Sequence, residues 1–541
     1  MVTRIYHWFD RTILELGREM RLSYLPPLMV YLAAGVSGLT GIVGMFFVKD
    51  YLGLSAEFIA ALGFWMGIPW ALKMPLGHLV DLIWRFKSVL VYIGAGLISI
   101  SLLIMVGLLS HRDAMADIMA VEAWFVLSAL LAPVGYVVQD VVADAMTVEA
   151  VPHFDKEGNA FDPSTIKLMH TTVQTLGRVA IIGGSVFVAL LNVYMFDGVA
   201  GMEESHKISV YTQIYEFALV IPIVSILGVL LGSWIKFKAY RNFRSQGKNR
   251  HDAWKMIHGH VEHTSPNWWI LGGSLVFVIF TLSLGLADFK YNQEVIFLGS
   301  LGIVLFLMSR LLKVLDQDAR NVLLGTAIII FIFRAMPGPG PGSTWWMIDD
   351  LGFDQQFLSV LSLIGGGLTL FGMFIFRRFM AEKSIAYIIV VLTIVSTILS
   401  FPIIGMFYDF HVWTAAHTGG VVDARFIALV DTALESPLGQ IAMIPMLAWI
   451  ANSAPANLKA TFFAVMASFT NLALSLSQLG TKYLNQIYTI KREVKDPGTG
   501  EIKVPEDYSE LGMLLMTVTF LGLAIPLITI FIVKRTPLRS A

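Results

Sequence analysis

Long apolar blocks limit how this chain can fold more than any other feature of its sequence. Residues 88–109, for example, contain no charged side chain. Eighteen or more apolar residues are enough for a helix to cross a hydrocarbon layer about 30 Å thick. Only 14% of the 541 residues are charged, whereas a soluble protein carries about 25%. The sequence therefore predicts an all-α polytopic membrane protein.

The apolar blocks predict 14 membrane-spanning helices. The weakest candidate, 320–336, ends where three prolines in the Pro-Gly repeat at 337–342 fix φ and remove backbone donors. The predicted spans are 24–48, 55–76, 87–110, 119–145, 168–195, 210–238, 266–288, 292–313, 320–336, 355–376, 384–408, 425–451, 457–486 and 511–533.

A basic run between residues 236 and 255 divides the chain, because six spans precede it and eight follow it. A weak internal repeat supports two halves: a glycine and a basic cluster recur at Gly77–Lys87 and at Gly372–Arg378. Repeated halves are typical of transporters. We expect a cytoplasmic N-terminal segment at 1–23, a six-helix bundle at 24–238, a basic cytoplasmic loop at 239–265, a two-helix insertion at 266–319, a second six-helix bundle at 320–533 and a tail at 534–541.

The distribution of Lys and Arg predicts which side of the membrane each loop occupies, because these residues favour the cytoplasmic side. Placing both termini inside puts about twice as many Lys and Arg inside as outside. We therefore expect a multi-pass protein of the cell (inner) membrane with both termini cytoplasmic. The outer loop 487–510 contains Pro-Gly-Thr-Gly at 497–500, which predicts a small hairpin.

Composition also excludes several classes of function. The chain has no cysteine, so it has no disulfide, thiolate metal site or Cys nucleophile. A formal net charge of −1 gives no large basic surface for nucleic acid. The histidines at 251, 258, 260 and 263 lack carboxylate or thiolate company at metal-ligand spacing. We expect no metal, no cofactor and no enzymatic activity.

Two carboxylates in the fourth predicted span are candidates for a functional site, because a charge inside the bilayer needs a partner, water or a function. Asp140 and Asp144 lie one turn apart on one helix face. Their proximity discourages double ionisation, which suits proton uptake. The alternative is a structural gate in which they pair with Lys73, with Arg85 or with a helix N-terminus. Lys73 itself lies near the inner end of span two, where a lysine is more often an interfacial anchor.

Further charges lie within other spans. Arg178 is about ten residues into the fifth span, and its guanidinium fork suits a carboxylate of either a substrate or Asp140 and Asp144; the alternative is a structural ion pair. Asp431 and Glu435 form another i, i+4 pair. This pair either binds a cation, a proton or the substrate, or it belongs to a buried polar network. Arg334 is either their partner or an interfacial anchor.

Trp345 and Trp346 follow the Pro-Gly repeat. Tryptophan is enriched at membrane–water interfaces, so we expect both to join an outer aromatic belt. Stacking on a flat ligand is the alternative.

Several stretches resemble the folate-biopterin transporter family of the major facilitator superfamily. The second span contains Pro-Trp-Ala-Leu-Lys-Met-Pro-Leu-Gly at 69–77, followed by Asp81. The fourth contains Gln-Asp-Val-Val-Ala-Asp-Ala at 139–145, and the fifth contains Gln174 through Arg178, then Gly183 and Gly184. Late matches are Asp431, Gln440, Pro445 and 454–471. The resemblance covers most of 24–238 and 320–486.

The resemblance implies two six-helix bundles of the major facilitator type and a secondary carrier that alternates between inward-open and outward-open states, commonly driven by protons. It implies a monomer in a lipid bilayer. Its substrate would be small, anionic and folate- or pterin-like, and transport would be coupled to a proton or another ion. Substrate would contact Gln174, Arg178, Arg334, Asp431 and Glu435. Coupling or gating would involve Lys73, Asp81, Arg85, Asp140 and Asp144.

The sequence also departs from the family pattern. Lys459 stands where the family has Glu, the basic cluster after Asp81 is thin, and the family generally has 12 spans. The muropeptide permease branch also resembles residues 139–145 and has two extra helices. The alternatives are therefore a carrier for another solute, such as muropeptides, and a membrane assembly or binding protein that does not transport.

Overall fold

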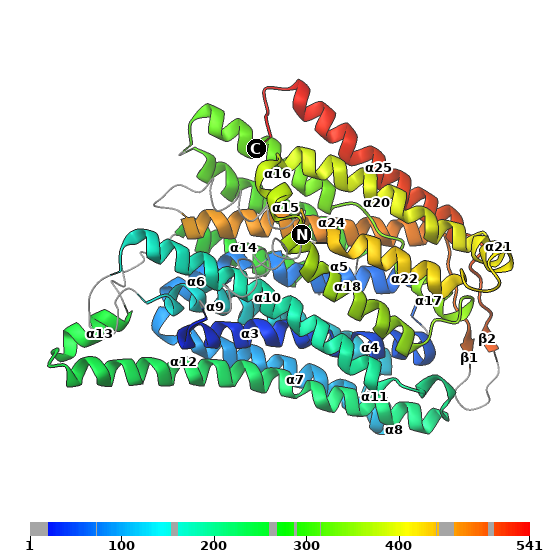
Figure 1. Ribbon diagram of the computed structural model, residues 1–541, viewed down its shortest axis with the longest axis horizontal. Coiled ribbons are helices and arrows are strands. Elements are labelled where there is room, and N and C mark those ends of the chain that lie inside the picture. Colours follow the sequence, from blue (N-terminus) through cyan, green and yellow to red (C-terminus); the bar gives the residue numbers. More distant parts are fainter. Residues whose placement is uncertain are drawn as a thin grey trace, which may run out of the picture.

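The computed structural model is a bundle of helices that run roughly along the long axis of the molecule (Figure 1). Nine helical segments in the described part of the chain are long and apolar enough to cross a membrane, which confirms a multi-pass membrane protein. The structure describes residues 20–52, 54–71, 73–152, 161–258, 268–285, 289–313, 315–439, 441–442, 459–495 and 502–540.

The helices before the basic run begin and end close to the predicted spans, except that two spans are divided. A 3-10 turn interrupts the first, and Leu219 separates α11 from α12 in the sixth; in the second, residue 72 between α5 and α6 lies outside the described residues. The elements are η2 (Leu22–Tyr24), α3 (Leu25–Val36), η3 (Ser37–Thr40), α4 (Gly41–Tyr51), α5 (Ala56–Ala71), α6 (Lys73–Leu82), η4 (Trp84–Phe86), α7 (Ser88–Ser110), α8 (Arg112–Ala116), α9 (Val121–Ala150), α10 (Pro163–Met195), η5 (Val199–Gly201), α11 (Glu204–Ala218) and α12 (Val220–Ser245).

The later helices also follow the predicted spans. The span predicted at 320–336 ends at Arg334 before the Pro-Gly repeat, and a short helix that we did not predict follows the repeat. The elements are α13 (Arg250–His258), α14 (Trp268–Gly285), α15 (Asn292–Leu312), α16 (Gln317–Arg334), α17 (Pro341–Asp349), α18 (Gln355–Ile375), α19 (Arg377–Glu382), α20 (Ile385–Phe407), α21 (Phe410–His417), α22 (Ala424–Glu435), η6 (Ser436–Leu438), α24 (Lys459–Ile487) and α25 (Leu511–Arg535).

A small hairpin lies between α24 and α25, as the sequence predicted. Strand β1 (Val494–Lys495) pairs antiparallel with β2 (Ile502–Val504), and Lys491 bridges to Asp507 at the base. The hairpin lies at the right-hand end of the molecule in Figure 1, opposite α13. We call these two ends the hairpin end and the α13 end.

Close packing between helices depends on small residues. The Cβ of any side chain at Gly94 of α7 would lie 2.6 Å from the carbonyl oxygen of Gly135 on α9, and one at Gly135 would lie 2.7 Å from the carbonyl oxygen of Gly94. The two backbones can approach this closely only because both residues are glycine, which is a common way for membrane helices to pack. This contact fixes the position of α9, the helix that carries Asp140 and Asp144.

Helices α14 and α15 pack against both halves of the chain. Glu294 of α15 forms an ion pair with Lys482 of α24 at 3.1 Å. The neighbouring Gln293 donates to the carbonyl of Ala61 on α5 at 3.4 Å. Helix α15 therefore contacts the packed pair formed by α5 and α24.

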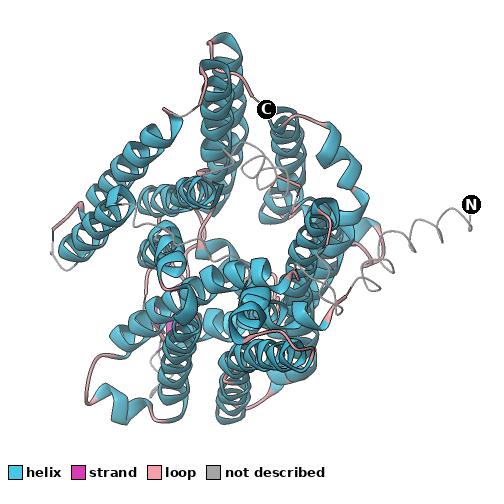
Figure 2. Ribbon diagram, turned by 90° about the vertical axis from the view of Figure 1, so that its left-hand side faces the viewer, coloured by secondary structure: helices cyan, strands magenta, loops and turns pink. Residues whose placement is uncertain are grey.

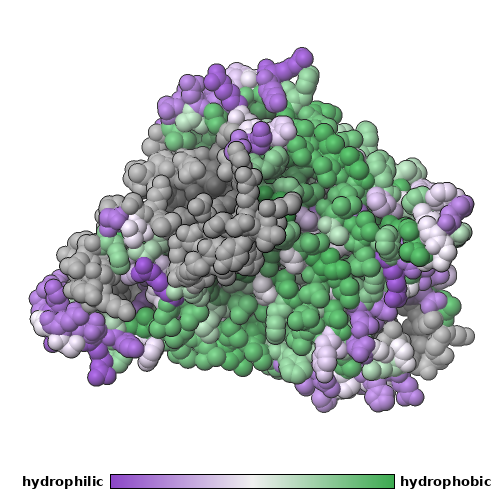
Figure 3. Space-filling view, viewed as in Figure 1, coloured by the Kyte–Doolittle hydropathy of each residue, from purple (hydrophilic) through white to green (hydrophobic). Residues whose placement is uncertain are grey.

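The surface of the bundle is largely apolar. Apolar side chains cover the middle of the face in Figure 3, whereas polar ones gather around the helix ends. Viewed from the α13 end, most helices are seen nearly along their axes (Figure 2). Large apolar residues such as Leu298, Phe401 and Phe520 are more than 59% exposed, as expected for side chains that face lipid.

The predicted outer aromatic belt at Trp345 and Trp346 is wrong. Helix α17 turns both indoles inward, and their side chains are only 2% and 3% exposed. Gly340 adopts φ 78° directly before the helix, a conformation that favours glycine and redirects the chain. The guanidinium carbon of Arg492 lies 5.1 Å from the ring centroid of Trp345. These tryptophans form part of the core at the hairpin end.

Candidate functional site

The candidate site begins where the start of α6 lies against α9. Lys73 is the first residue of α6. Nearby, the carbonyl of Trp70 accepts a hydrogen bond from the side-chain amide of Asn471 on α24 at 3.2 Å. The packing of α6 on α9 thus places a lysine beside α9, and the bond from Asn471 links the second predicted span to α24.

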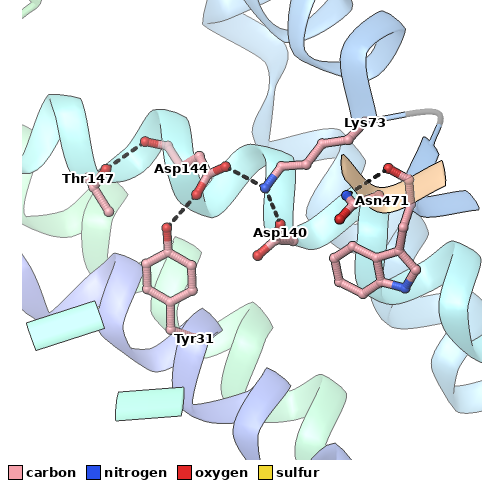
Figure 4. Close-up of polar contacts among 7 residues, drawn as sticks. Tyr31, Lys73, Asp140, Asp144, Thr147 and Asn471 are labelled. Atoms are coloured by element: carbon pink, nitrogen blue, oxygen red, sulfur yellow. Dashed lines mark hydrogen bonds and ion pairs between the residues drawn. The ribbon is translucent and has the colours of Figure 1, made fainter. Parts of the chain in front are cut away.

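Lys73 forms ion pairs with both carboxylates of α9. Its Nζ lies 2.6 Å from Oδ2 of Asp140 and 2.8 Å from Oδ2 of Asp144 (Figure 4). The hydroxyl of Tyr31 on α3 donates to Oδ1 of Asp144 at 2.6 Å. We call these four residues the α9 cluster.

The position of Lys73 corrects its prediction as an interfacial anchor and agrees with the pairing expected for a gate. Its side chain is 18% exposed and its amine faces α9, so the interpretation as an interfacial anchor is wrong. The pairing with Asp140 and Asp144 is the one that the gate alternative required. Because one lysine faces two carboxylates, the three groups together retain a negative charge when all are ionised, and a further cation nearby is favourable.

Arg178 supplies a cation near the α9 cluster. It lies on α10, is partly buried, and its charge acts on Asp140 and Tyr31. Among the residues that the structure describes, none forms an ion pair within 4 Å with Arg178. The guanidinium therefore keeps its planar set of donors available for an additional carboxylate.

A second ionic cluster lies one to two turns further along α9. The carboxylate of Glu149 lies 2.5 Å from Nζ of Lys87 and 2.6 Å from Nζ of Lys236. Burial acts to raise the pKa of Glu149, but the charges of Lys236 and Lys87 outweigh it, so the pKa falls below its ordinary value. This cluster ties together α7, α9 and α12.

The carboxylates of α22 have different surroundings. Asp431 is 8% exposed, and its Oδ1 is buried without a hydrogen-bond partner. Glu435 is exposed and is the neighbouring charge that acts on Asp431. The partnership of Arg334 with this pair stays a prediction.

Several predicted site residues cannot be placed at the level of side chains. The side chains of Asp81, Arg85 and Gln174 lie outside the described part of the structure, although their helices are described. Gln440, Pro445 and residues 454–458 also lie outside it, as do the N-terminal segment to residue 19 and the histidines at 260 and 263. Across the described residues, no group of three or more His, Asp or Glu side chains is arranged to hold a metal.

Sequence reasoning missed Tyr31, Lys87 and the pairing of Glu149. Tyr31 lies in an apolar block, and nothing in its neighbours distinguishes it from a packing residue. Its role depends on the contact between α3 and α9, which are more than 100 residues apart. Lys87 and Glu149 pair across different helices, so the sequence around each residue does not indicate its partner.

Comparison with known proteins identifies the family. The model of the BT1 family matches residues 34–539. A stretch of 158 residues is 28% identical to a folate-biopterin transporter of Synechocystis sp., and 177 residues are 27% identical to folate transporter 2 of Plasmodium falciparum. These alignments cover 29% and 32% of this chain, and they span only about a third of each relative, 31% and 36%.

Solved structures show the same fold at low identity. A crystal structure of a peptide transporter POT mutant has a TM-score of 0.59 and 13% identity, covering 95% of this chain and 94% of that chain. A mutant of the nucleoside transporter NupG has a TM-score of 0.53 and 11% identity, with coverages of 94% and 99%. Because the family model spans nearly the whole chain and the fold agrees with it, this chain belongs to the BT1 family.

Proposed function

We propose that this protein is a secondary transporter that moves a small, anionic, folate- or pterin-like solute by alternating access and is coupled to protons at buried carboxylates. Support comes from the family, from relatives that are named as folate-biopterin and folate transporters, and from neighbours with transporter folds. The proposal includes 14 spans, arranged as two six-helix bundles with a two-helix insertion between them, both termini in the cytoplasm, an inner-membrane location and a monomer.

The arrangement around Arg178 carries the proposal for an anionic solute. Lys73 is engaged by two carboxylates, whereas Arg178 remains without an ion pair among the described residues. A guanidinium that is partly buried beside a satisfied cluster offers charge-assisted hydrogen bonds to an arriving carboxylate. Folates and many other organic anions carry such a group. In this proposal Arg178 binds substrate, and the α9 cluster balances the charge.

Alternating access requires that the two halves separate at one end while they close at the other. At the hairpin end, the side-chain amide of Gln355 donates to the hydroxyl of Tyr211 at 2.7 Å, and that of Gln356 donates to Asp197 at 3.0 Å. Arg492 also donates to the carbonyl of Val48. We infer that these bonds close the hairpin end and must break when that end opens.

Proton coupling is proposed for Asp431 and Glu435. A buried carboxylate without a hydrogen bond is costly when ionised, and the cost falls when it binds a proton. The exposed Glu435 one turn away gives Asp431 a route to water through the pair. A proton bound there in one conformation and released in the other would couple transport to the gradient.

The test is uptake of radiolabelled folate and pterin into proteoliposomes, with and without an imposed proton gradient. Arg178→Ala is expected to reduce uptake at least about a hundredfold, the loss expected when a charged hydrogen bond of roughly 3 kcal/mol is removed. Arg178→Lys keeps the charge but not the fork and is expected to retain partial activity. Gel filtration and thermal unfolding check that both variants fold.

Arg320→Ala is the matched control, because Arg320 is an exposed arginine at the start of α16. It should transport as the unaltered protein does. Full uptake by Arg178→Ala would remove Arg178 from substrate binding. Absence of uptake by the unaltered protein for any folate, pterin or muropeptide, together with saturable binding of one of them, would favour a binding protein instead of a carrier.

A further inference from the structure

A basic surface at the α13 end has no role in the proposed transport cycle. Residues 234–254, which we call the basic elbow, contain six Lys or Arg residues and one acid, Asp252. They cover the last turns of α12, a tight turn and the start of α13. Five of the six cations are exposed: Lys238, Arg241, Arg244, Lys248 and Arg250. Polar side chains gather at this corner of the molecule in Figure 3.

The turn of the basic elbow is well defined by its hydrogen bonds. Gly247 adopts φ 84°, and the N–H of Lys248 donates to the carbonyl of Phe243 at 3.2 Å. Asn249 and Asp252 bond reciprocally at 2.7 Å and cap α13. Phe243 is 8% exposed, because α13 folds back along α12. The cations are therefore held on an ordered scaffold.

Aromatic residues lie one turn before two of these cations. Nζ of Lys238 lies 5.2 Å from the ring centroid of Trp234, and the guanidinium carbon of Arg241 lies 6.0 Å from that of Phe237. Both rings are exposed, at 51% and 58%. The Cα of each cationic residue lies about 6 Å further along the helix axis than the Cα of its aromatic partner. Aromatic rings favour the boundary between acyl chains and headgroups, so the cations reach the level of the phosphates.

The general preference of basic residues for one side of the membrane explains why cations occur here, but it requires no ligand. The structure adds that most of these cations are not neutralised by an ion pair. Of the six, Lys236 pairs with Glu149, whereas the five exposed cations form no ion pair with any described carboxylate. At the hairpin end, by contrast, Arg425 pairs with Asp354. The basic elbow thus presents a positive surface without counter-charges.

We propose that the basic elbow binds the phosphate headgroups of anionic phospholipids in the adjacent leaflet. Juxtamembrane clusters of four to eight Lys or Arg residues attract anionic lipid by about 1 kcal/mol for each cation, which is about a fivefold gain in affinity. The ion pair between Lys236 and Glu149 connects the elbow to α9. Lipid bound here would therefore contact the half of the molecule that carries Arg178 and the α9 cluster.

The absence of cysteine in the chain allows a direct test with one introduced label. The full-length protein carrying Asn242→Cys, labelled with a fluorophore, is reconstituted in phosphatidylcholine vesicles. Acyl-brominated phosphatidylglycerol or acyl-brominated phosphatidylcholine is then added as the quencher. We expect half-maximal quenching at a mole fraction of phosphatidylglycerol at least tenfold below that of phosphatidylcholine.

The variant Lys238→Gln/Arg241→Gln should lose most of this preference, and both positions are exposed, so folding should be retained. Lys290→Gln/Lys491→Gln is the matched control, since it removes two exposed cations elsewhere, and it should keep the preference. Salt of about 1 M should abolish the preference in the unaltered protein, because the Debye length falls to about 3 Å. Equal quenching by the two lipids, a preference unaffected by salt, or equal losses in the two variants would each overturn the proposal.

Discussion

The carboxylates of α9 and those of α22 have the same helical spacing but very different surroundings. On α9, Asp140 and Asp144 share Lys73, and Tyr31 donates a further hydrogen bond. On α22, the buried Oδ1 of Asp431 has no hydrogen-bond partner, and the nearest charge is the like charge of Glu435. Neighbouring side chains hold the first pair by ion pairs and a hydrogen bond. The second pair has no such partner and is available to bind or release a proton or a ligand.

This difference separates two uses of a charge inside a membrane protein. An ion pair that is complete contributes to the packing of its helices, and removing one partner leaves an expensive uncompensated charge. A carboxylate without a partner contributes little to stability in its ionised form but is available to a proton or a ligand. Substitutions in the α9 cluster should therefore lower stability most. Substitution of Asp431 on α22 should change stability little and act mainly on transport.

Lys73→Met should have the largest effect. It leaves Asp140 and Asp144 facing each other without a cation, and removing one partner of a buried pair costs about 3–5 kcal/mol. The measurement is unfolding in mixed micelles, compared with the unaltered protein. Lys73→Met combined with Asp140→Asn and Asp144→Asn should recover most of the loss. If the single substitution changes stability by less than 1 kcal/mol, the α9 cluster does not hold α6 against α9.

Glu149→Gln should have an intermediate effect, because it removes the counter-charge of Lys87 and Lys236. Hydrogen bonds to charged groups contribute about 1.5–3 kcal/mol, so a loss of about 2 kcal/mol is expected at neutral pH. The pKa of Glu149 is lowered in the folded protein, so its contribution is complete above the ordinary value of 4.5 and is lost as pH falls through the lowered value.

Unfolding of Glu149→Gln and of the unaltered protein, measured from pH 7 down to about pH 2.5, checks this dependence. The two stabilities should differ most at pH 7 and converge as the pH falls below 4.5. A difference that is constant with pH would mean that the charge of Glu149 does not stabilise the contact among α7, α9 and α12.

Tyr31→Phe should have a smaller effect than either. It removes only the hydrogen bond to Asp144, while Lys73 remains, so the expected loss is about 1–2 kcal/mol. Tyr136→Phe is a suitable comparison, because Tyr136 is a partly buried tyrosine on α9 outside the cluster. A double-mutant cycle of Tyr31→Phe with Asp144→Asn should show coupling; additive effects would mean that the bond between these residues contributes nothing.

The sequence predicted most of the fold because apolar length and turn chemistry are local. The helix at 87–110, the end of α16 before the Pro-Gly repeat and the hairpin between α24 and α25 all followed from their own residues. The prediction for Trp345 and Trp346 failed for the opposite reason. Whether a tryptophan faces lipid or a core depends on helices distant in sequence, and here α17 turns both rings inward.

The same limit applies to the candidate site. The spacing of Asp140 and Asp144 identified both as candidates, but it gave several possible partners and did not include Tyr31. Choosing Lys73 required the packing of α6 on α9, and finding Tyr31 required the packing of α3 on α9. Helical periodicity places residues on a face, but it does not say which other helix that face contacts.

Asp431→Asn should have the smallest effect on stability, within about 0.5–1 kcal/mol in either direction. The buried Oδ1 has no hydrogen bond to lose, and removing the charge relieves the repulsion from Glu435. Asp144→Asn is the matched substitution on α9, and it should destabilise the protein more because it loses bonds to Lys73 and Tyr31. If Asp431 binds the coupling proton, Asp431→Asn should also abolish accumulation driven by a proton gradient while exchange without a gradient persists. A strongly destabilised Asp431→Asn variant, or one with normal gradient-driven uptake, would remove the distinction between α22 and α9.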